Sequence, residues 1–311
     1  MKPFSLFAAA LWRFGYLIDS KTRLAQKKGT KFNTPLLGIG SLLAGGAGKT
    51  PYTAFLAGKL KTQGISVGIL CKNTGDENLW LKKKGFEVFT GNRFELCKKL
   101  DGKFDVLISD DGLEDRRLSH AFWICLTWDE SAKNLRDIIP YGNCRSLWKD
   151  HPEIACVKKC AMEWEKNAKS ADIVFYMKPP LNASGEILPQ NSKIATITGI
   201  ARSHRFFEGL QKNYSIAKKI DCPDHFNIQK KIEQALKLGL PVVITEKNAS
   251  RLSQSVLESR NVFVCELEVK QLCHHRSDNQ IHQSDVQKDN PTQVHNVVVA
   301  EAWQSPAKPN P

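Results

Sequence analysis

The sequence predicts an α/β fold, in which a parallel sheet with helices on both faces is followed by a smaller C-terminal α/β lobe. Apolar runs of strand length alternate with helical stretches along residues 36–127. A glycine-rich turn lies between the first apolar run and the first helix of this alternation. After a segment rich in Pro, Asn, Ser and Gly at residues 179–189, a second and shorter alternation begins. These three observations predict domains at residues 32–190 and 191–270.

The composition is that of a globular protein with an unbalanced charge. The 311 residues are 41% hydrophobic and 25% charged, and the net charge is +13 at pH 7. Such an excess favours phosphates, nucleic acid or an anionic membrane surface as partners. No RNA- or DNA-binding motif accompanies it, so we expect no nucleic acid and no obligate protein partner. The nine cysteines form no C-x-x-C pair, which indicates structural thiols in a reducing cytosol.

The glycine-rich turn has the pattern of a phosphate-binding loop, or P-loop. An apolar strand over residues 36–39 precedes it, and a helix over residues 51–60 follows. Backbone N–H groups and a helix N-terminus would then face an anion, with Lys49 at the β/γ-phosphates and Thr50 on Mg²⁺. The residues expected to contact a nucleoside triphosphate are Gly45, Gly46, Ala47, Gly48, Lys49, Thr50 and Pro51. A flexible glycine-rich turn without a ligand is the alternative, and Leu43 occupies the place of the motif's usual first glycine.

Carboxylates follow the strands predicted at residues 65–71 and 104–109. Asp110 and Asp111 come directly after the second of these, where a Walker B-type acid would hold Mg²⁺. Asp76 and Glu77 lie in a predicted loop after the first. Ligands in parallel sheets bind at the carboxyl ends of the strands, so these groups and Lys49 are expected at one edge. An acidic turn in solvent is the alternative for each pair.

The second lobe is predicted from strands at residues 194–198, 241–245 and 262–267 and helices at 205–210 and 228–238. Asp224 and His225 precede the second helix, where the histidine is either catalytic or structural. Glu246 and Lys247 follow the strand at 241–245, and a salt-bridged turn is the favoured interpretation there. From about residue 271 to 311 the polar composition predicts a mostly disordered tail.

Residues 1–31 are predicted to form an N-terminal membrane-surface helix and a basic segment. The apolar stretch over residues 4–18 contains Trp12 and Tyr16, and Arg13 interrupts it. It is too short to span a bilayer, and lysines and arginines follow it. This pattern suits a helix lying in the interface of an anionic membrane. A first helix packed on the core is the alternative, and one helix can do both.

In their order, these motifs resemble those of the tetraacyldisaccharide 4′-kinases of lipid A biosynthesis. That family's P-loop reads G-N-L-T-V-G-G-T-G-K-T-P, and residues 40–51 here read G-S-L-L-A-G-G-A-G-K-T-P, so Leu43 stands where the family also lacks a glycine. The family's G-D-E-P and D-D-G-[FL]-Q-H-x-x-L are similar to residues 75–78 and 110–118. Its P-x-G-x-L-R, A-G-I, P-D-H and T-E-K-D are similar to residues 140–145, 198–200, 223–225 and 245–248.

The resemblance implies a kinase that moves the γ-phosphoryl group of ATP, with Mg²⁺, to the 4′-hydroxyl of a lipid A disaccharide precursor, a tetraacyldisaccharide 1-phosphate. It places the protein peripherally on the cytoplasmic face of the inner membrane. Asp76 would be the base or the orienting group for the sugar hydroxyl, assisted by His225 from the second lobe, while Lys49 binds phosphates. The residues implied around the metal are Thr50, Glu77, Asp110 and Asp111. Closure of the lobes on ATP would assemble this site.

The chain departs from the family pattern at several positions. After the second strand the family carries S-R-G-Y-G and a long loop before G-D-E, whereas three residues separate Cys71 from Gly75 here. Single replacements of family residues are Glu114, Asp115, Ser146 and Asn248. The shortened loop favours an alternative function, a regulatory or catalytically impaired P-loop protein that binds nucleotide and lipid. A kinase for a soluble small molecule is a further alternative.

Overall fold

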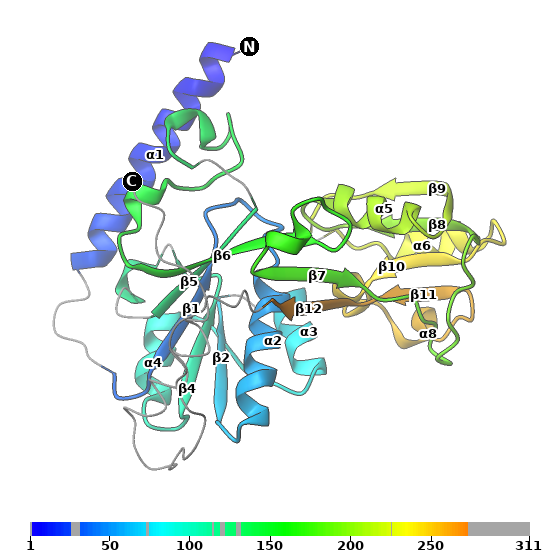
Figure 1. Ribbon diagram of the computed structural model, residues 1–311, viewed down its shortest axis with the longest axis horizontal. Helices are drawn as coiled ribbons and strands as arrows, with labels where there is room; N and C mark the ends of the chain where they lie inside the picture. The colour runs from blue at the N-terminus through cyan, green and yellow to red at the C-terminus, as the bar shows by residue number, and fades with distance from the viewer. Residues whose placement is uncertain are drawn as a thin grey trace.

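The computed structural model describes residues 2–25, 32–72, 75–113, 115–118, 122–128, 132–224 and 226–272. These residues form two lobes, each built on its own sheet (Figure 1). The α/β fold with a smaller C-terminal α/β lobe is therefore confirmed. The predicted disordered tail at 271–311 lies almost entirely outside the described residues.

The large lobe is built on an eight-stranded sheet with the order β12-β7-β6-β5-β1-β4-β2-β3. Its strands are β1 (Leu36–Gly40), β2 (Val67–Cys71), β3 (Glu87–Thr90), β4 (Val106–Asp110), β5 (Phe122–Thr127), β6 (Ile154–Met162), β7 (Ile173–Met177) and β12 (Leu267–Gln271). All neighbours pair in parallel except β12, which is antiparallel to β7. Strand β1, which leads into the P-loop, is thus central and pairs with β4 and β5.

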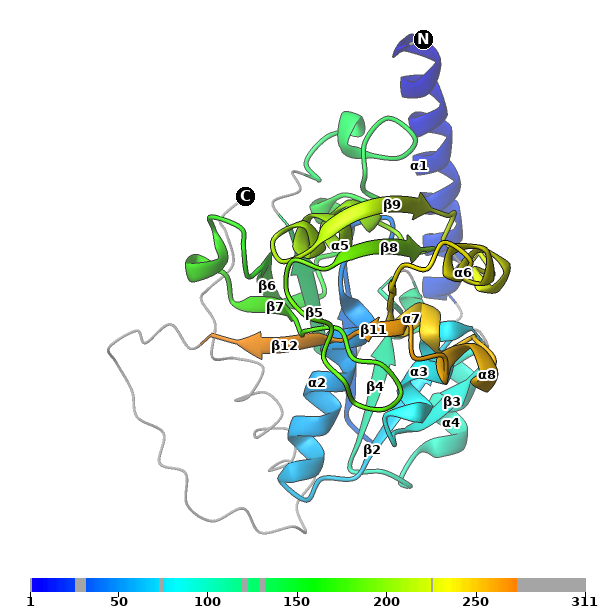
Figure 2. The ribbon, with the colours of Figure 1, turned by 90° about the vertical axis from the view of Figure 1, so that its right-hand side faces the viewer.

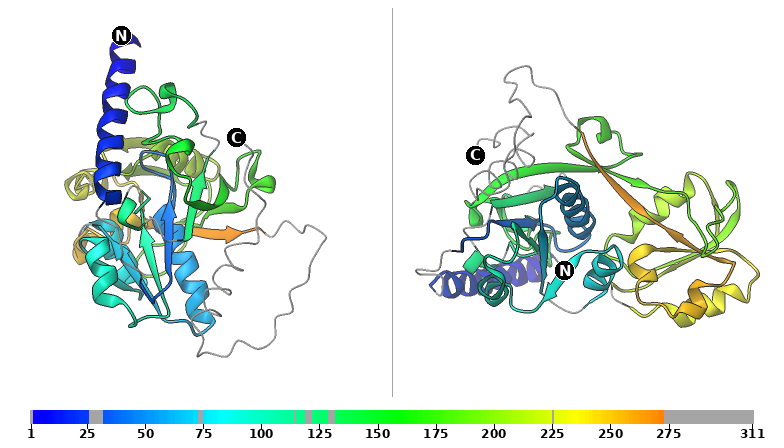
Figure 3. Two further views of the ribbon diagram at one scale, coloured as in Figure 1. Left: turned by 90° about the vertical axis from the view of Figure 1, so that its left-hand side faces the viewer. Right: turned by 90° about the horizontal axis from the view of Figure 1, so that it is seen from below.

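Helices cover both faces of this sheet, as predicted (Figure 3). The helices of the large lobe are α1 (Lys2–Ala25), α2 (Lys49–Thr62), α3 (Asp76–Lys83) and α4 (Arg93–Leu100). Short 3₁₀ turns are η1 (Arg116–Leu118), η2 (Leu135–Asp137), η3 (Trp148–Asp150) and η4 (Ala168–Ser170). Helix α2 packs Tyr52 and Leu56 into the core on one face, and α4 packs Phe94 and Cys97 into the core on the other. Burial of these apolar side chains stabilises the sheet between two cores.

The small lobe is built on a four-stranded parallel sheet with the order β11-β10-β8-β9. Its strands are β8 (Lys193–Thr198), β9 (Ser215–Asp221), β10 (Val242–Thr245) and β11 (Val262–Cys265). Its helices are α5 (Ser203–Gln211), α6 (Gln229–Leu236), α7 (Glu246–Ala249) and α8 (Gln254–Leu257). The predicted strand at 262–267 is in fact two strands, because the chain leaves the small sheet at Cys265 and enters the large one at Leu267.

Strands β7 and β12 connect the lobes. The chain leaves the large lobe after β7 and returns through β12, which lies beside β7 (Figures 1 and 2). Two antiparallel strands therefore form the covalent link between the lobes, and helices α3 and α7 also contact each other across the boundary. Such a connection suits relative motion of two compact lobes.

Helix α1 is fixed to the large lobe on one side only. Arg13 donates two hydrogen bonds to Asp150 at 2.6 and 2.9 Å, and the Tyr16 hydroxyl lies 3.0 Å from His151 Nε2. The family replacement Ser146 is buried and its Oγ lies 2.8 Å from the same nitrogen. Burial acts to raise the pKa of Asp150, but Arg13 and a backbone N–H outweigh it and lower this pKa.

The opposite side of α1 carries an exposed apolar stripe. Phe7, Leu11, Phe14 and Ile18 are 61, 56, 64 and 49% exposed. Their spacing places them on one helix face. The N-terminal part of α1 projects beyond the body of the lobe (Figure 1). Within the described residues, no helix combines the length and apolar character needed to cross a membrane. The eight described cysteines are free thiols, as predicted, and all but Cys222 are buried.

Candidate active site

The P-loop connects β1 to α2, as predicted. Gly45, Gly46 and Gly48 have φ angles of 86, 64 and 75°, a region that side chains strongly disfavour. A Cβ on Gly48 would also lie 2.5 Å from the Phe175 ring. Pro51 lies in the first turn of α2, where a missing N–H group removes no intrahelical hydrogen bond. The chain therefore turns tightly enough to aim several backbone N–H groups at one point.

The structure brings Lys49 and Thr50 to the carboxylates at the end of β4. Lys49 Nζ lies 3.2 Å from Asp111 Oδ1, and Arg145 Nη1 lies 3.4 Å from the same oxygen. The Thr50 hydroxyl donates to Asp110 Oδ2 at 2.9 Å, and the Thr53 hydroxyl donates to Oδ1 at 3.0 Å. Four of the predicted site residues thus meet where two strand ends lie side by side.

The pKa values of Asp110 and Asp111 are shifted in opposite directions. Burial, followed by the charges of Glu77 and Asp111, raises the pKa of Asp110 to about 6. Burial acts the same way on Asp111, but Lys49, Arg145 and other cations outweigh it and lower the pKa of Asp111. Asp111 adopts a φ of 54° at the turn after β4, which an aspartate tolerates. The site therefore contains one well-compensated carboxylate and one carboxylate that lacks sufficient positive charge.

Asp76 and Glu77 begin helix α3 rather than lying in a loop, which corrects the prediction. The helix follows the short segment after β2, and acidic groups in its first turn interact favourably with the helix dipole. Asp76 is only 1% exposed. Arg251 Nη2 lies 2.6 Å from Asp76 Oδ1, and Lys247 Nζ lies 3.4 Å from Oδ2.

Lys247 gathers carboxylates from both lobes. Its Nζ is 3.3 Å from Glu77 Oε1 in the large lobe and 3.5 Å from Asp224 Oδ1 in the small lobe. Burial acts to lower the pKa of Lys247, but Glu77, Asp224 and Asp76 outweigh it and raise this pKa. The ion pairs expected at Lys247 are present, but Glu246 and Lys247 begin helix α7 rather than a turn, and two of the three carboxylates belong to the other lobe. His225, beside Asp224, lies outside the described residues, as does Glu114.

The donor set at β4 fits a divalent cation of the Mg²⁺ type. Carboxylate and hydroxyl oxygens are hard ligands, and the raised pKa of Asp110 marks a deficit of positive charge there. Among the described residues no group of three or more His, Cys, Asp or Glu side chains is arranged to hold a metal ion. One or two carboxylates and several phosphate oxygens are the usual ligands of Mg²⁺ in nucleotide sites, and this arrangement fits that pattern.

A family model described as LpxK, tetraacyldisaccharide-1-P 4′-kinase, matches residues 1–73 and 70–284. The chain belongs to this family. The two matched segments overlap at residues 70–73, in the short connection between β2 and α3.

Relatives from several species are similar to most of the chain. The tetraacyldisaccharide 4′-kinase of Neisseria gonorrhoeae is 26% identical over 302 residues, which cover 85% of this chain and 85% of the relative. That of Delftia acidovorans is 29% identical over 251 residues, covering 70% and 72%. A crystal structure of LpxK from Aquifex aeolicus, an "apo" form in complex with ATP, has a TM-score of 0.56 at 20% identity. It covers 86% of this chain and 93% of its own, and this likeness supports the fold.

The family replacement Asn248 lies behind the site and not in it. Asn248 is 1% exposed, and its Oδ1 accepts hydrogen bonds from Thr198 Oγ1 at 2.8 Å and Thr245 Oγ1 at 2.9 Å. These contacts join the carboxyl ends of β8 and β10, which are neighbours in the small sheet. An uncharged amide suits this buried position, because its hydrogen bonds compensate its loss of water.

The predicted set omits several cations that contact it. Arg145 binds Asp111, Arg251 binds Asp76, and Arg202 and Arg205 bind the P-loop backbone. Arg145 is the last residue of the segment that resembles the family's P-x-G-x-L-R motif, so the sequence does point to it. No motif of the resemblance includes Arg251, Arg202 or Arg205. Their contacts depend on how the lobes pack.

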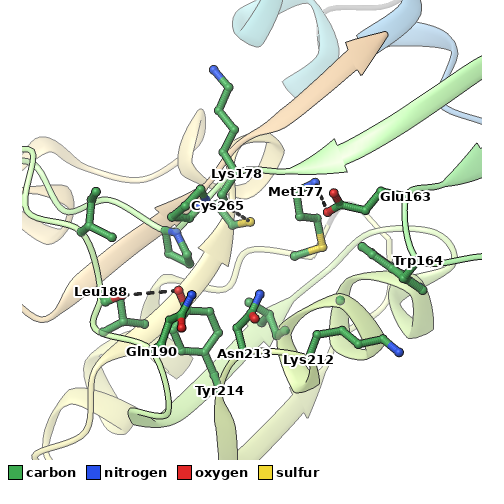
Figure 4. Close-up of a pocket in the computed structure, with 15 residues that line it drawn as sticks. Glu163, Trp164, Met177, Lys178, Leu188, Gln190, Lys212, Asn213, Tyr214 and Cys265 are labelled. Atoms are coloured by element: carbon green, nitrogen blue, oxygen red, sulfur yellow. Dashed lines mark hydrogen bonds between the residues drawn. The ribbon is translucent and has the colours of Figure 1, made fainter. Parts of the chain in front are cut away.

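A separate cavity of about 310 Å³ lies between α5, the end of β7 and the loop after it (Figure 4). Its walls include Trp164, Met177, Leu188 and Tyr214, with Lys212 at the side (Figure 4). No predicted site residue lines this cavity. The candidate active site is consequently defined by its ionic contacts at the carboxyl edge of the large sheet.

Proposed function

We propose that this protein transfers the γ-phosphoryl group of ATP to the 4′-hydroxyl of a tetraacyldisaccharide 1-phosphate in lipid A biosynthesis. Family membership supplies the acceptor and the reaction. One observation carries the assignment to particular residues. Asp76 of the large lobe and Asp224 of the small lobe both bind Lys247, and the charge of Glu77, next to Asp76, acts on Asp110.

The P-loop is proposed to bind the ATP phosphates. Three of its glycines adopt positive φ angles, and the helix behind it begins at Lys49. The relative from Aquifex aeolicus was crystallised with ATP, which supports the same nucleotide here. Asp111 holds Lys49 Nζ at 3.2 Å and so positions the ammonium group for the β/γ-phosphates.

Thr50 and Asp110 are proposed to hold Mg²⁺, with Glu77 and Asp111 nearby. Bound Mg²⁺ would neutralise negative charge on the phosphates during transfer. Thr50 and Thr53 orient the Asp110 carboxylate by donating to its two oxygens. The charge of Glu77 acts on Asp110, which supports placing the start of α3 beside this group.

Asp76 is proposed to accept the proton of the 4′-hydroxyl, with His225 assisting from the small lobe. In the closed arrangement Asp76 is buried and paired with Arg251 and Lys247. The acceptor hydroxyl therefore reaches this carboxylate only when the lobes separate and close again around the substrate.

The apolar stripe of α1 is proposed to lie in the surface of an anionic membrane, on the cytoplasmic face of the inner membrane. Phe7, Leu11, Phe14 and Ile18 are exposed although they are large and apolar. The basic residues that follow in the sequence would contact lipid phosphates. A membrane-surface location suits an acceptor that carries four acyl chains.

The decisive experiment compares the wild type with Asp76→Asn, using labelled ATP, Mg²⁺ and the tetraacyldisaccharide 1-phosphate. We expect transfer by the wild type, and about a hundredfold or greater loss in Asp76→Asn with ATP binding retained. The matched control is Asp105→Asn, which changes an exposed aspartate just before β4, at the opposite edge of the sheet. ATP binding without transfer by the wild type would instead support the regulatory protein that the shortened loop between Cys71 and Gly75 favours.

A further inference from the structure

The small lobe lies directly on the P-loop. The segment after β8 reaches Gly45 and Gly46, where a Cβ on Gly46 would lie 2.8 Å from Arg202 Cγ and 3.0 Å from the Ala201 carbonyl oxygen. Glycine at position 46 is therefore required twice, for its φ of 64° and for the approach of the other lobe. The phosphate-binding loop and the small lobe share one packed surface.

Three side chains bind three successive carbonyl groups of the P-loop. Arg202 Nε donates to the Gly45 carbonyl at 3.2 Å, and Arg205 Nη1 donates to the Gly46 carbonyl at 3.2 Å. Trp128 Nε1, from the end of β5, donates to the next carbonyl, that of Ala47, at 3.0 Å.

The peptide geometry converts these contacts into an orientation of the loop's N–H groups. In a trans peptide the C=O group and the following N–H group point in opposite directions. Fixing the carbonyls of residues 45, 46 and 47 toward the three donors therefore turns the N–H groups of residues 46, 47 and 48 away from them. Successive N–H groups aimed at one side form an anion-binding concavity.

Aromatic stacking fixes the position of one of the arginines. The Arg205 guanidinium lies 3.5 Å from the centroid of the Trp128 ring. Trp128 in turn stacks on Phe175, with centroids 5.3 Å apart and an interplanar angle of 21°. Phe175 is the ring that a Cβ on Gly48 would meet. The stacked rings of Trp128, directly after β5, and Phe175, within β7, thus hold Arg205 beside the loop that it binds.

We propose that Arg202 and Arg205 are positioning residues that hold the P-loop in its anion-binding shape. Two of the three donors come from the small lobe, so the loop is fully organised only while that lobe is docked. Docking of the lobe and binding of nucleotide phosphates then favour each other, because each stabilises the same loop conformation. The inference rests on the proposed function only in taking the phosphates of ATP as the ligand.

The test uses the full chain carrying Arg202→Ala and Arg205→Ala together. Arg260→Ala is the matched control, since it removes an exposed arginine of the same lobe. Hydrogen exchange of the P-loop amides is measured without nucleotide, and ATP affinity is measured by calorimetry. We expect faster exchange over residues 44–50 and unchanged exchange in β10, which reports that the small lobe remains folded.

We also expect ATP affinity to fall about tenfold for each charge-assisted hydrogen bond removed. The KM for ATP should rise more than kcat falls, and Arg205→Lys should restore affinity only in part, because an ammonium group cannot stack flat on Trp128. Unchanged exchange and unchanged affinity in the double variant would overturn the inference. Absence of ATP binding by the wild type would instead refute the proposed function, and the exchange measurement would still test the role of the arginines.

Discussion

At the scale of one residue, the buried Asp110 carboxylate destabilises the folded protein when it is ionised. Its carboxylate is buried, accepts hydrogen bonds from Thr50 and Thr53, and has neither Lys49 nor Arg145 as a direct ion-pair partner among the described contacts. Lys49 and Arg145 instead bind Asp111. A buried carboxylate with a raised pKa is costly when ionised and is typical of functional sites.

We predict that Asp110→Asn stabilises the metal-free protein at pH 7.5. The pKa of Asp110 rises from 3.8 to about 6 on folding, so the folded protein holds a proton that the unfolded chain releases between these values. The stabilisation that this bound proton gives the folded protein is complete below pH 3.8 and is lost as the pH rises through about 6. At pH 7.5 the ionised group therefore costs up to about 3 kcal/mol, which the amide avoids.

Urea unfolding in a chelating buffer at pH 7.5 and pH 4.5 would check this prediction. The gain in Asp110→Asn should shrink at the lower pH, and kinase activity should be lost at both. Asp101→Asn should change the free energy of unfolding at pH 7.5 in the opposite direction, as a destabilisation. Burial acts to raise the pKa of Asp101, but N–H groups of Thr34 and Asn33 outweigh it and lower this pKa. A larger gain at pH 4.5 than at pH 7.5 in Asp110→Asn would contradict the account.

At the scale of one element, helix α1 has two faces with different tasks. One face carries Arg13 and Tyr16, which join it to Asp150 and His151. Trp12 Nε1 also donates a hydrogen bond to the Arg145 carbonyl at 3.0 Å, and the side chain of the same Arg145 binds Asp111. The helix is therefore fixed to the same segment that supports the active site, while its apolar stripe stays exposed.

We predict that Phe7→Glu combined with Phe14→Glu abolishes vesicle binding. Each phenylalanine buried in lipid is worth about tenfold in partitioning, so the pair should cost about a hundredfold. Sedimentation with vesicles rich in anionic phosphatidylglycerol measures the loss. Leu238→Glu is the control, because Leu238 is 51% exposed and lies on the small lobe. Equal sedimentation of the double variant and the control would refute the membrane role of α1.

At the scale of the whole molecule, ion pairs hold the two lobes closed around Asp76. Arg251 and Lys247 reach Asp76 from the small lobe, and Lys84 of the large lobe lies 2.6 Å from Glu246 Oε1. The covalent link consists of β7 and β12 (Figure 1). Closure therefore depends on charge complementarity that a single reversal can break.

We predict that Arg251→Glu opens the molecule. A glutamate would face the buried Asp76 carboxylate, and like charges at such a distance cost on the order of 2 kcal/mol or more. Small-angle scattering should show a larger radius of gyration, and turnover should fall by about tenfold or more. Arg260→Glu makes the same charge change at an exposed site of that lobe and should leave both unchanged. An unaltered radius of gyration in Arg251→Glu would contradict closure by ion pairs.

The elements that the sequence did not predict share a physical reason. No hydrophobic pattern predicts strand β6, because Lys158 and Lys159 interrupt its apolar run, yet Cys156, Lys158 and Cys160 alternate on one buried face. Strand β9 is an exposed edge strand rich in lysine, so no hydrophobic pattern marks it. The sequence predicts a loop at the start of α3, because Gly75 precedes the helix and the helix contains few apolar residues. In each case pairing or packing with a neighbour outweighs local composition.

The amino-acid sequence by itself determined the order of most strands and helices, the P-loop and the acidic strand ends. These features depend on residue types that are adjacent in the chain, such as a glycine turn between an apolar run and a helix. Only the tertiary structure decided that Lys247, Arg251, Arg202 and Arg205 belong to the site. Asp76 and the P-loop carbonyl groups that they bind lie more than a hundred residues away, so these contacts arise from the docking of two lobes, which no local pattern encodes. The P-loop remains the feature around which the fold is built, and its shape depends in part on arginines from the other lobe.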